Sequence, residues 1–260
     1  MTTSDNEPLV IADRRGNVGI LTINRPAARN AISKAVTIAM AAEIDRFESD
    51  DDIRVLIVTG AGDTAFCAGA DLKSMKDGRP VVHELGGLAG ITSRAFVKPL
   101  IAAVNGFALG GGMEICLASD LVVAEEHATF GLPEVRRGIV AAAGGLERLP
   151  HRLPPAIAME LILTGEPISA QRAADLGMVN RVVARGEGMN AALAIAEVIC
   201  RGAPLAIQYS KAVAQSSIAT GEHAAVEAHT DLHRAVFRSA DASEGRQAFA
   251  EKRAPVWSGR

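Results

Sequence analysis

Short apolar runs and longer helical patterns succeed one another along most of the chain. Two runs, at residues 9–11 and 18–23, predict a β-hairpin. From Ser33 onward, apolar residues recur at the spacing of an amphipathic helix. The runs at residues 54–59 and 100–104 contain almost no polar residue, which is typical of strands covered on both faces. The pattern therefore predicts a mixed α/β protein.

The chain also resembles itself. A unit of apolar strand, glycine turn, small-residue loop and helix start spans residues 55–72, 99–114 and, more loosely, 121–134. Repeats of this kind predict a spiral of stacked turns. Such a stack can bring the backbone N–H groups of Ala70 and Gly111 together on one oxygen atom, which is the geometry of an oxyanion hole.

The last part of the chain has a different pattern, with helical spacing and no strand signal. We therefore divide the chain into a core at residues 1–187 and a helical segment at residues 188–260. The apolar residues of this segment outnumber those that it can bury against itself, so it packs either on another subunit or back on the core. The helices are predicted at residues 190–200, 204–216, 222–238 and 243–253. Before it, residues 73–94 are rich in glycine, proline and charge and predict a loop or short helix over a pocket.

Composition narrows the possible partners. Hydrophobic residues make up 48% and aromatic residues 3%, so the core must consist of Ala, Val, Leu and Ile. A net charge of −3 without long runs of one sign argues against nucleic acid or an anionic membrane as the main partner. Three cysteines without metal-ligand spacing predict a reduced, cytoplasmic protein without a metal. The polar N-terminus does not resemble a signal peptide, and the uncharged stretch 99–113 is too short to cross a bilayer.

Two glycine-rich stretches are candidates for chemistry. Gly110-Gly111-Gly112 precedes a predicted helix with Glu114 in its first turn, so an acid lies beside backbone that can approach a ligand closely. The alternative is a tight turn with a surface glutamate that suits the helix dipole. The stretch from Gly60 to Ala65 fits the dinucleotide fingerprint G-x-G-x-x-A, although no helix pattern follows it at once.

Taken together, these segments resemble the crotonase superfamily, the enoyl-CoA hydratase/isomerase fold. The resemblance covers nearly the whole chain in order. It is carried by residues 24–26 (NRP), 30–31 (NA), 65–73 (AFCAGADLK), 102–106 (AAVNG), 110–114 (GGGME), 130–134 (FGLPE) and 248–253 (AFAEKR). Within the family, residues 153–157, 203–207 and 249–257 resemble carnitinyl-CoA dehydratases.

The resemblance implies an α/β fold with a ββα spiral core and an all-helical C-terminal trimerisation segment, assembled as trimers or paired trimers. It implies an acyl-CoA thioester substrate and no separate cofactor, because coenzyme A is part of the substrate. Ala70 and Gly111 would hold the thioester oxygen. The CoA-binding positions would be Ala68, Asp71, Leu72, Lys73, Phe249 and Lys252, the last two on the CoA of the same or of a neighbouring subunit.

Glu114 and Glu134 occupy the two positions that the resemblance assigns to hydratase chemistry. Having both favours a 2-enoyl-CoA hydratase, in which Glu114 deprotonates water and Glu134 protonates Cα. Relatives with one glutamate act as isomerases, hydrolases or dehalogenases. A carnitinyl-CoA dehydratase is the main alternative, and its quaternary ammonium substrate favours an acidic or aromatic lining. A non-catalytic acyl-CoA-binding protein is another. Ala141-Ala142 departs from the commoner family residues beside the acyl group.

Overall fold

The computed structural model of the protein describes residues 7–72, 84 and 86–260. Within these residues the strands form two sheets, one of six strands and one of four. The larger sheet has the order β1 (Val10–Arg15), β2 (Val18–Ile23), β3 (Val55–Gly60), β5 (Leu100–Val104), β7 (Leu121–Glu125) and β10 (Arg181–Val183). The smaller sheet has the order β4 (Ala65–Cys67), β6 (Phe107–Leu109), β8 (Thr129–Gly131) and β9 (Ile168–Ser169).

The three repeats are the turns of a spiral. Each gives one strand to each sheet, as the pairs β3/β4, β5/β6 and β7/β8, and neighbouring turns pair in parallel. The spiral predicted from the repeats is thus confirmed. The second strand of each turn was predicted as loop, and this was wrong. These strands have three residues each, too few for an alternating pattern to show in the sequence.

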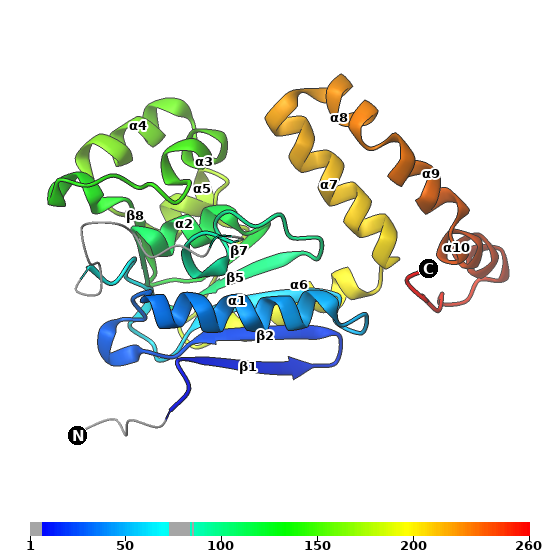
Figure 1. Cartoon of the computed structure of the whole chain (residues 1–260), viewed down its shortest axis with the longest axis horizontal. Coiled ribbons are helices and arrows are strands. Elements are labelled where there is room, and N and C mark those ends of the chain that lie inside the picture. The colour runs from blue at the N-terminus through cyan, green and yellow to red at the C-terminus, as the bar shows by residue number, and fades with distance from the viewer. Residues whose placement is uncertain (1–6, 73–83, 85) are drawn as a thin grey trace.

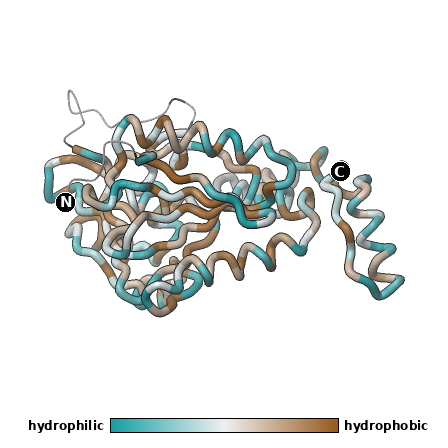
Figure 2. Tube along the Cα trace, turned by 90° about the horizontal axis from the view of Figure 1, so that it is seen from below, coloured by the Kyte–Doolittle hydropathy of each residue, from teal (hydrophilic) through white to brown (hydrophobic). Residues whose placement is uncertain are grey.

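Helices cover both faces of the larger sheet (Figure 1). Leu56 and Val58 pack in the same apolar cluster as residues of helix α1, whereas Val55 and Ile57 pack with Ala192 of helix α6 on the opposite face. Burial on both faces explains the continuous apolar run of β3, and Figure 2 shows the hydrophobic colour along the central strands. The helices around the spiral are α1 (Lys34–Ser49), α2 (Gly111–Ala118), α3 (Gly145–Arg152), α4 (Pro155–Thr164), α5 (Ala170–Asp175) and α6 (Gly188–Cys200), with 3-10 turns η1 (Pro26–Ala28), η4 (Leu88–Gly90) and η5 (Pro133–Arg137).

The remaining helices project from the core as an arm (Figure 1). Lys211 fixes its base, because the Nζ atom lies 2.7 Å from Asp120 Oδ2 and donates to Lys98 O at 2.8 Å. The single helix predicted at residues 222–238 is in fact broken at His229, whose Nδ1 lies 2.9 Å from Ala225 O and competes for that helical carbonyl. The arm consists of α7 (Pro204–Thr220), α8 (Glu222–Ala228), α9 (Thr230–Arg238) and α10 (Ala240–Glu251).

No single helix among the described residues is long and apolar enough to cross a membrane. Helix α6 and residues 204–218 pass that test only as a pair, which is bent by 108°.

The region predicted to cover a pocket falls largely on residues 73–83 and 85, which lie outside the described part of the chain.

A glycine lets helix α2 lie directly against strand β4. A Cβ atom built on Gly112 would stand 2.0 Å from the carbonyl oxygen of Cys67, a backbone atom that cannot swing away. The contact thus requires glycine inside a helix, where glycine is disfavoured by about 1 kcal/mol relative to alanine.

We expect Gly112→Ala to lower the free energy of unfolding, because overpacking against a backbone atom costs about 1–3 kcal/mol or more, which exceeds the gain in helix propensity. Gly245→Ala is the matched control: Gly245 lies in α10, and its added Cβ would meet only the Trp257 ring, at 3.3 Å. Urea unfolding of both variants measures the difference. Equal stability of Gly112→Ala and the wild type would contradict the close contact.

Candidate active site

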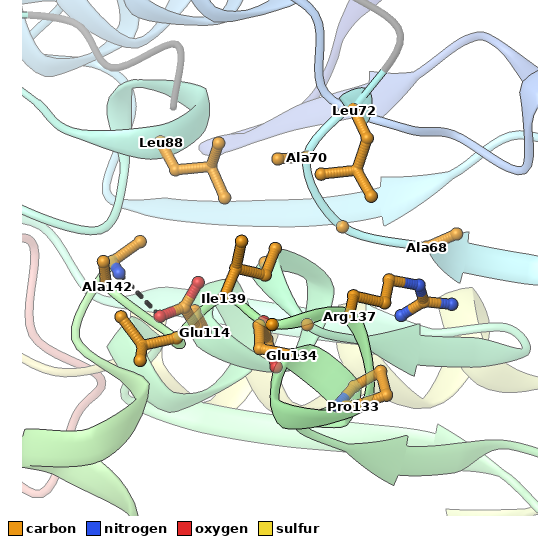
Figure 3. Close-up of a pocket in the computed structure, with 16 residues that line it drawn as sticks. Ala68, Ala70, Leu72, Leu88, Glu114, Pro133, Glu134, Arg137, Ile139 and Ala142 are labelled. Carbon is orange, nitrogen blue, oxygen red and sulfur yellow. Dashed lines mark hydrogen bonds between the residues drawn. The ribbon is translucent and has the colours of Figure 1, made fainter. Parts of the chain in front are cut away.

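An apolar cavity of about 450 Å³ opens beside the start of helix α2 (Figure 3). All three repeats, the η4 turn and the segment that follows the third repeat enclose it. Its lining consists of Ala68, Gly69, Ala70, Leu72, Leu88, Gly110, Gly111, Glu114, Pro133, Glu134, Arg137, Gly138, Ile139, Val140, Ala142 and Ala143. The spiral thus brings Ala70, Gly111, Glu114 and Glu134 together, although 64 positions separate the first from the last along the chain (134 − 70).

Two backbone N–H groups approach each other at the edge of this cavity. A Cβ built on Gly111 would stand 3.3 Å from Ala70 N, and one built on Gly69 would stand 3.2 Å from Gly111 N. Gly111 begins α2, so its N–H has no intrahelical partner. Ile32 holds the facing loop by donating to Gly69 O and accepting from Asp71 N, both at 2.9 Å. Neither the Ala70 nor the Gly111 N–H donates a hydrogen bond within the described residues, which leaves both for a ligand oxygen.

Glu114 is buried one turn into helix α2, with 3% of its surface exposed. Its Oε1 accepts hydrogen bonds from Ala143 N at 2.7 Å and Gly145 N at 2.9 Å. Burial raises the pKa of Glu114 to about 7, and the charge of Glu134 acts in the same direction. The two amides and Arg148 oppose this rise in pKa. Such a carboxyl can both release and take up a proton near neutral pH.

Glu134 lies in the first turn of η5, beside Gly110, the residue that immediately precedes α2. It is 9% exposed, and burial raises its pKa against the opposing effects of its own backbone amide and the charge of Arg137. A Cβ built on Gly110 would stand 2.8 Å from Glu134 Oε1, so the carboxyl packs against bare backbone. The buried Oε2 has no hydrogen-bond partner among the described residues. A buried carboxyl oxygen without a partner is costly, and a ligand in the cavity can supply one.

The other predicted positions are divided between the cavity and other places. Ala68 and Leu72 line the cavity. Asp71 forms an ion pair with Arg25 across 3.0 Å instead. Lys73 lies outside the described residues. Phe249 and Lys252 lie at the end of helix α10, out on the arm, so a single copy of the chain does not bring them to the cavity (Figure 1). Their contact with CoA stays a prediction.

The dinucleotide interpretation of the sequence can now be judged. Strand β4 follows the Gly60 turn where a dinucleotide fingerprint would open a helix, so that interpretation was wrong. Cys67 beside the site is fully buried, and burial raises the pKa of its thiol to about 12, so this thiol is protonated at neutral pH and packs as a small apolar group. In the described residues no group of three or more His, Cys, Asp or Glu side chains could hold a metal ion.

Sequence reasoning missed part of the lining. Ile139 and Val140 form apolar walls, and Arg137 extends toward Ala68 at one side (Figure 3), whereas Leu88 belongs to the region at residues 73–94 that was predicted to cover a pocket. The amides that bind Glu114 belong to the Ala-Ala-Gly-Gly run at residues 142–145. The glycines of this run were the available signal, since Gly144 has a φ of +99° and Gly145 packs against the Glu114 side chain.

A spiral of ββα turns with two free amides and two buried carboxyls around an apolar cavity defines a crotonase-fold enzyme. The family model for enoyl-CoA hydratase/isomerase matches residues 13–260, and the chain belongs to this family, whose members act on acyl-CoA thioesters.

Named relatives agree with this family. A carnitinyl-CoA dehydratase of Salmonella typhi is 44% identical over 257 residues, covering 95% of this chain and 97% of its own. The structure of an enoyl-CoA hydratase from Mycobacterium tuberculosis H37Rv superposes with a TM-score of 0.93 at 46% identity, over 98% of this chain and 100% of its own. A carnitinyl-CoA hydratase from Mycobacterium avium superposes with a TM-score of 0.79 at 46% identity, over 98% and 100%.

The buried Glu114 carboxyl makes the stability of the protein depend on pH. Its pKa is about 7 when folded and 4.5 in a model peptide, so the folded state retains a proton that the unfolded state releases. This contribution to stability is fully present below pH 4.5 and is lost as the pH rises through about 7. A shift of about 2.5 pKa units corresponds to about 3 kcal/mol.

We therefore expect Glu114→Gln, which keeps the acceptor for both amides, to gain stability relative to the wild type by up to about 3 kcal/mol between pH 4.5 and pH 8. Urea unfolding at a series of pH values measures this difference. The exposed Glu160→Gln is the control and should show no such trend. A constant difference between Glu114→Gln and the wild type would mean that the carboxyl is not held protonated.

Proposed function

We propose that this protein is a 2-enoyl-CoA hydratase, which adds water reversibly across the 2,3 double bond of an enoyl thioester without a separate cofactor. The observation that carries the proposal is the pairing of two free backbone N–H groups with two buried carboxyls around one apolar cavity. The two amides can stabilise the negative charge that develops in the reaction, and the two carboxyls can transfer its protons.

The amides of Ala70 and Gly111 act on the thioester. As water attacks Cβ, negative charge develops on the carbonyl oxygen, and two fixed donors in a water-poor site stabilise it. Losing one such donor in other enzymes costs about 3–4 kcal/mol of transition-state stabilisation. Because both donors are backbone groups on the spiral itself, they need no rearrangement when charge appears.

The carboxyls exchange protons with water and Cα. In hydration Glu114 removes a proton from the attacking water and Glu134 gives a proton to Cα; in dehydration the roles reverse. Both directions therefore need the pair to hold one proton in total, on one carboxyl or the other. The pair loses this last proton as the pH rises through about 7, the pKa of Glu114. Consequently, kcat/KM should decline in both directions above that pH.

The second candidate is a carnitinyl-CoA dehydratase, which the names of several relatives favour. Its quaternary ammonium substrate would bind best against aromatic or acidic side chains. The described lining offers no aromatic residue, and residues 73–83 and 85 contain no Phe, Tyr or Trp. Arg137 carries the same charge as that substrate. These features favour an uncharged acyl group. An isomerase needs only one carboxyl, so the presence of two favours hydration.

Recognition of CoA extends the proposal to the assembly. Ala68, Leu72 and the neighbouring Asp71 and Lys73 would line the CoA from the chain that holds the cavity. Phe249 is 87% exposed on the arm, as expected for a side chain that another subunit covers. We propose trimers or paired trimers, in which this arm reaches its neighbour.

The first test is the loss of the enoyl-thioester absorbance of crotonyl-CoA. We expect turnover by the wild type and a decrease in kcat of about 10²–10⁴-fold in Glu114→Gln and in Glu134→Gln, because each loses one proton-transfer group. Both variants should still bind CoA, which calorimetry measures. A wild type that binds acyl-CoA without turning over crotonyl-CoA would contradict hydratase activity on this substrate.

A second test separates the two acyl classes. We expect a higher kcat/KM for crotonyl-CoA than for crotonobetainyl-CoA, because the described lining offers the cation no aromatic face and, apart from the two carboxyls proposed for proton transfer, no acidic side chain. Competition between the two thioesters in one assay measures the ratio directly. The opposite preference would support the carnitinyl-CoA dehydratase.

A further inference from the structure

Arg148 of helix α3 connects two segments that form opposite walls of the cavity. One is the segment at residues 139–145, which holds Glu114 through two amides. The other contains η4 and Leu88, which lies across the cavity from Glu114 (Figure 3). About 50 positions of sequence separate the two segments, yet both contribute to the acyl end.

The guanidinium group spans these segments with its planar fork. Its Nη2 donates to Thr92 O at 2.6 Å, and its Nη1 donates to Ala143 O at 3.2 Å. A Cβ built on Gly144 would stand 1.7 Å from Nη1, so the group lies directly over the bare backbone of that glycine. Arginine suits this place because it bonds two acceptors from one rigid plane, whereas a lysine ammonium is a point charge.

Each of the two residues that accept from Arg148, Thr92 and Ala143, is connected in turn to a group at the cavity. Thr92 is buried and accepts from Leu88 N at 2.9 Å, and a Cβ built on Gly111 would stand 2.3 Å from Leu88 Cδ2. On the other side, the amide of Ala143 itself donates to Glu114. Two residues, Thr92 and Leu88, therefore lie between Arg148 and the Gly111 amide on one wall, and one residue, Ala143, lies between Arg148 and the Glu114 carboxyl on the other.

We propose that Arg148 is a positioning residue that fixes the Leu88 wall and the Glu114-binding segment relative to each other. This inference rests on the proposed hydratase function. Arg148 does not line the cavity, so it acts through the groups that it holds. Its positive charge also lowers the pKa of Glu114, which gives the role a signature separate from stability.

The charges around Glu114 allow that signature to be assigned. Glu134 from η5 and Arg148 from α3 are the charged groups that act on it. The rest of α2, β4 and η4 contributes no other Asp, Glu, Lys, Arg or His. On α3, Glu147 and His151 are exposed, and Arg152 donates to Ser119 O at 2.6 Å, at the opposite end of α2.

The experiment compares Arg148→Met and Arg148→Lys with Arg152→Met, which removes a similar half-buried arginine from the same helix. For Arg148→Met we expect kcat on crotonyl-CoA to fall about 10–100-fold, as for other small misplacements of catalytic groups. The decline of kcat/KM at alkaline pH should move to higher pH, since a positive charge beside Glu114 is lost. Arg148→Lys should lose kcat but retain the wild-type position of that decline.

A readout independent of turnover separates this inference from the hydratase proposal. The carboxyl ¹³C signals of labelled glutamate are followed against pH, with Glu114→Gln to assign Glu114. We expect Glu114 to titrate at higher pH in Arg148→Met than in the wild type, and Arg152→Met to match the wild type. A wild type inert toward crotonyl-CoA would contradict hydratase activity and leave this comparison intact.

Two results would overturn the positioning role. One is an Arg148→Met protein that is folded by circular dichroism yet keeps the wild-type kcat and Glu114 titration. The other is an Arg152→Met protein that changes both to the same extent, because the effect would then be general to α3. If Arg148→Met does not fold, the loss of kcat in Arg148→Lys, compared with Arg152→Lys, decides the question.

Discussion

The contact between Gly112 and the Cys67 carbonyl is the constraint on which the site depends. It brings the start of α2 against the end of β4. The Gly111 amide is at the start of this helix, and the Ala70 amide lies in the loop that follows this strand, so the contact also brings the two amides together. A side chain at residue 112 would separate the two turns of the spiral and therefore separate Ala70 N from Gly111 N. The proposed oxyanion hole depends on how closely two backbones stack, and among the described residues no side chain contributes a donor to it.

Burial gives the two carboxyls their chemistry. Glu114 lies on a helix between the smaller sheet and α3, and Glu134 lies on the next turn of the spiral, so the same stacking that aligns the amides removes both acids from water. The cost of burying them appears as raised pKa values. Hydrogen bonds from the amides of Ala143 and Gly145 limit the rise in the pKa of Glu114. Among the described residues Glu134 Oε2 has no hydrogen-bond partner, and a ligand in the cavity can supply one.

Basic side chains that do not line the cavity connect the segments around it. Arg148 fastens the residue 139–145 segment to Thr92, and Lys211 fastens the arm to Asp120 at the end of α2. Both side chains connect segments that strand pairing within the spiral does not connect. Arg148 therefore acts on segments beside the start of α2, and Lys211 acts beside its end, each from an element that follows α2 in the chain.

The repeats, the buried strands and the meeting of Ala70, Gly111, Glu114 and Glu134 around one cavity were predictable from the sequence alone. These follow from local patterns and from resemblance, because hydrophobic periodicity and glycine positions are written residue by residue. The three-residue strands of the second sheet, the partners of Glu114 and the contacts of Arg148 became known only with the tertiary structure. Each of these depends on which segments meet across the spiral, and a contact between Arg148 and Thr92 leaves no periodic mark on either segment.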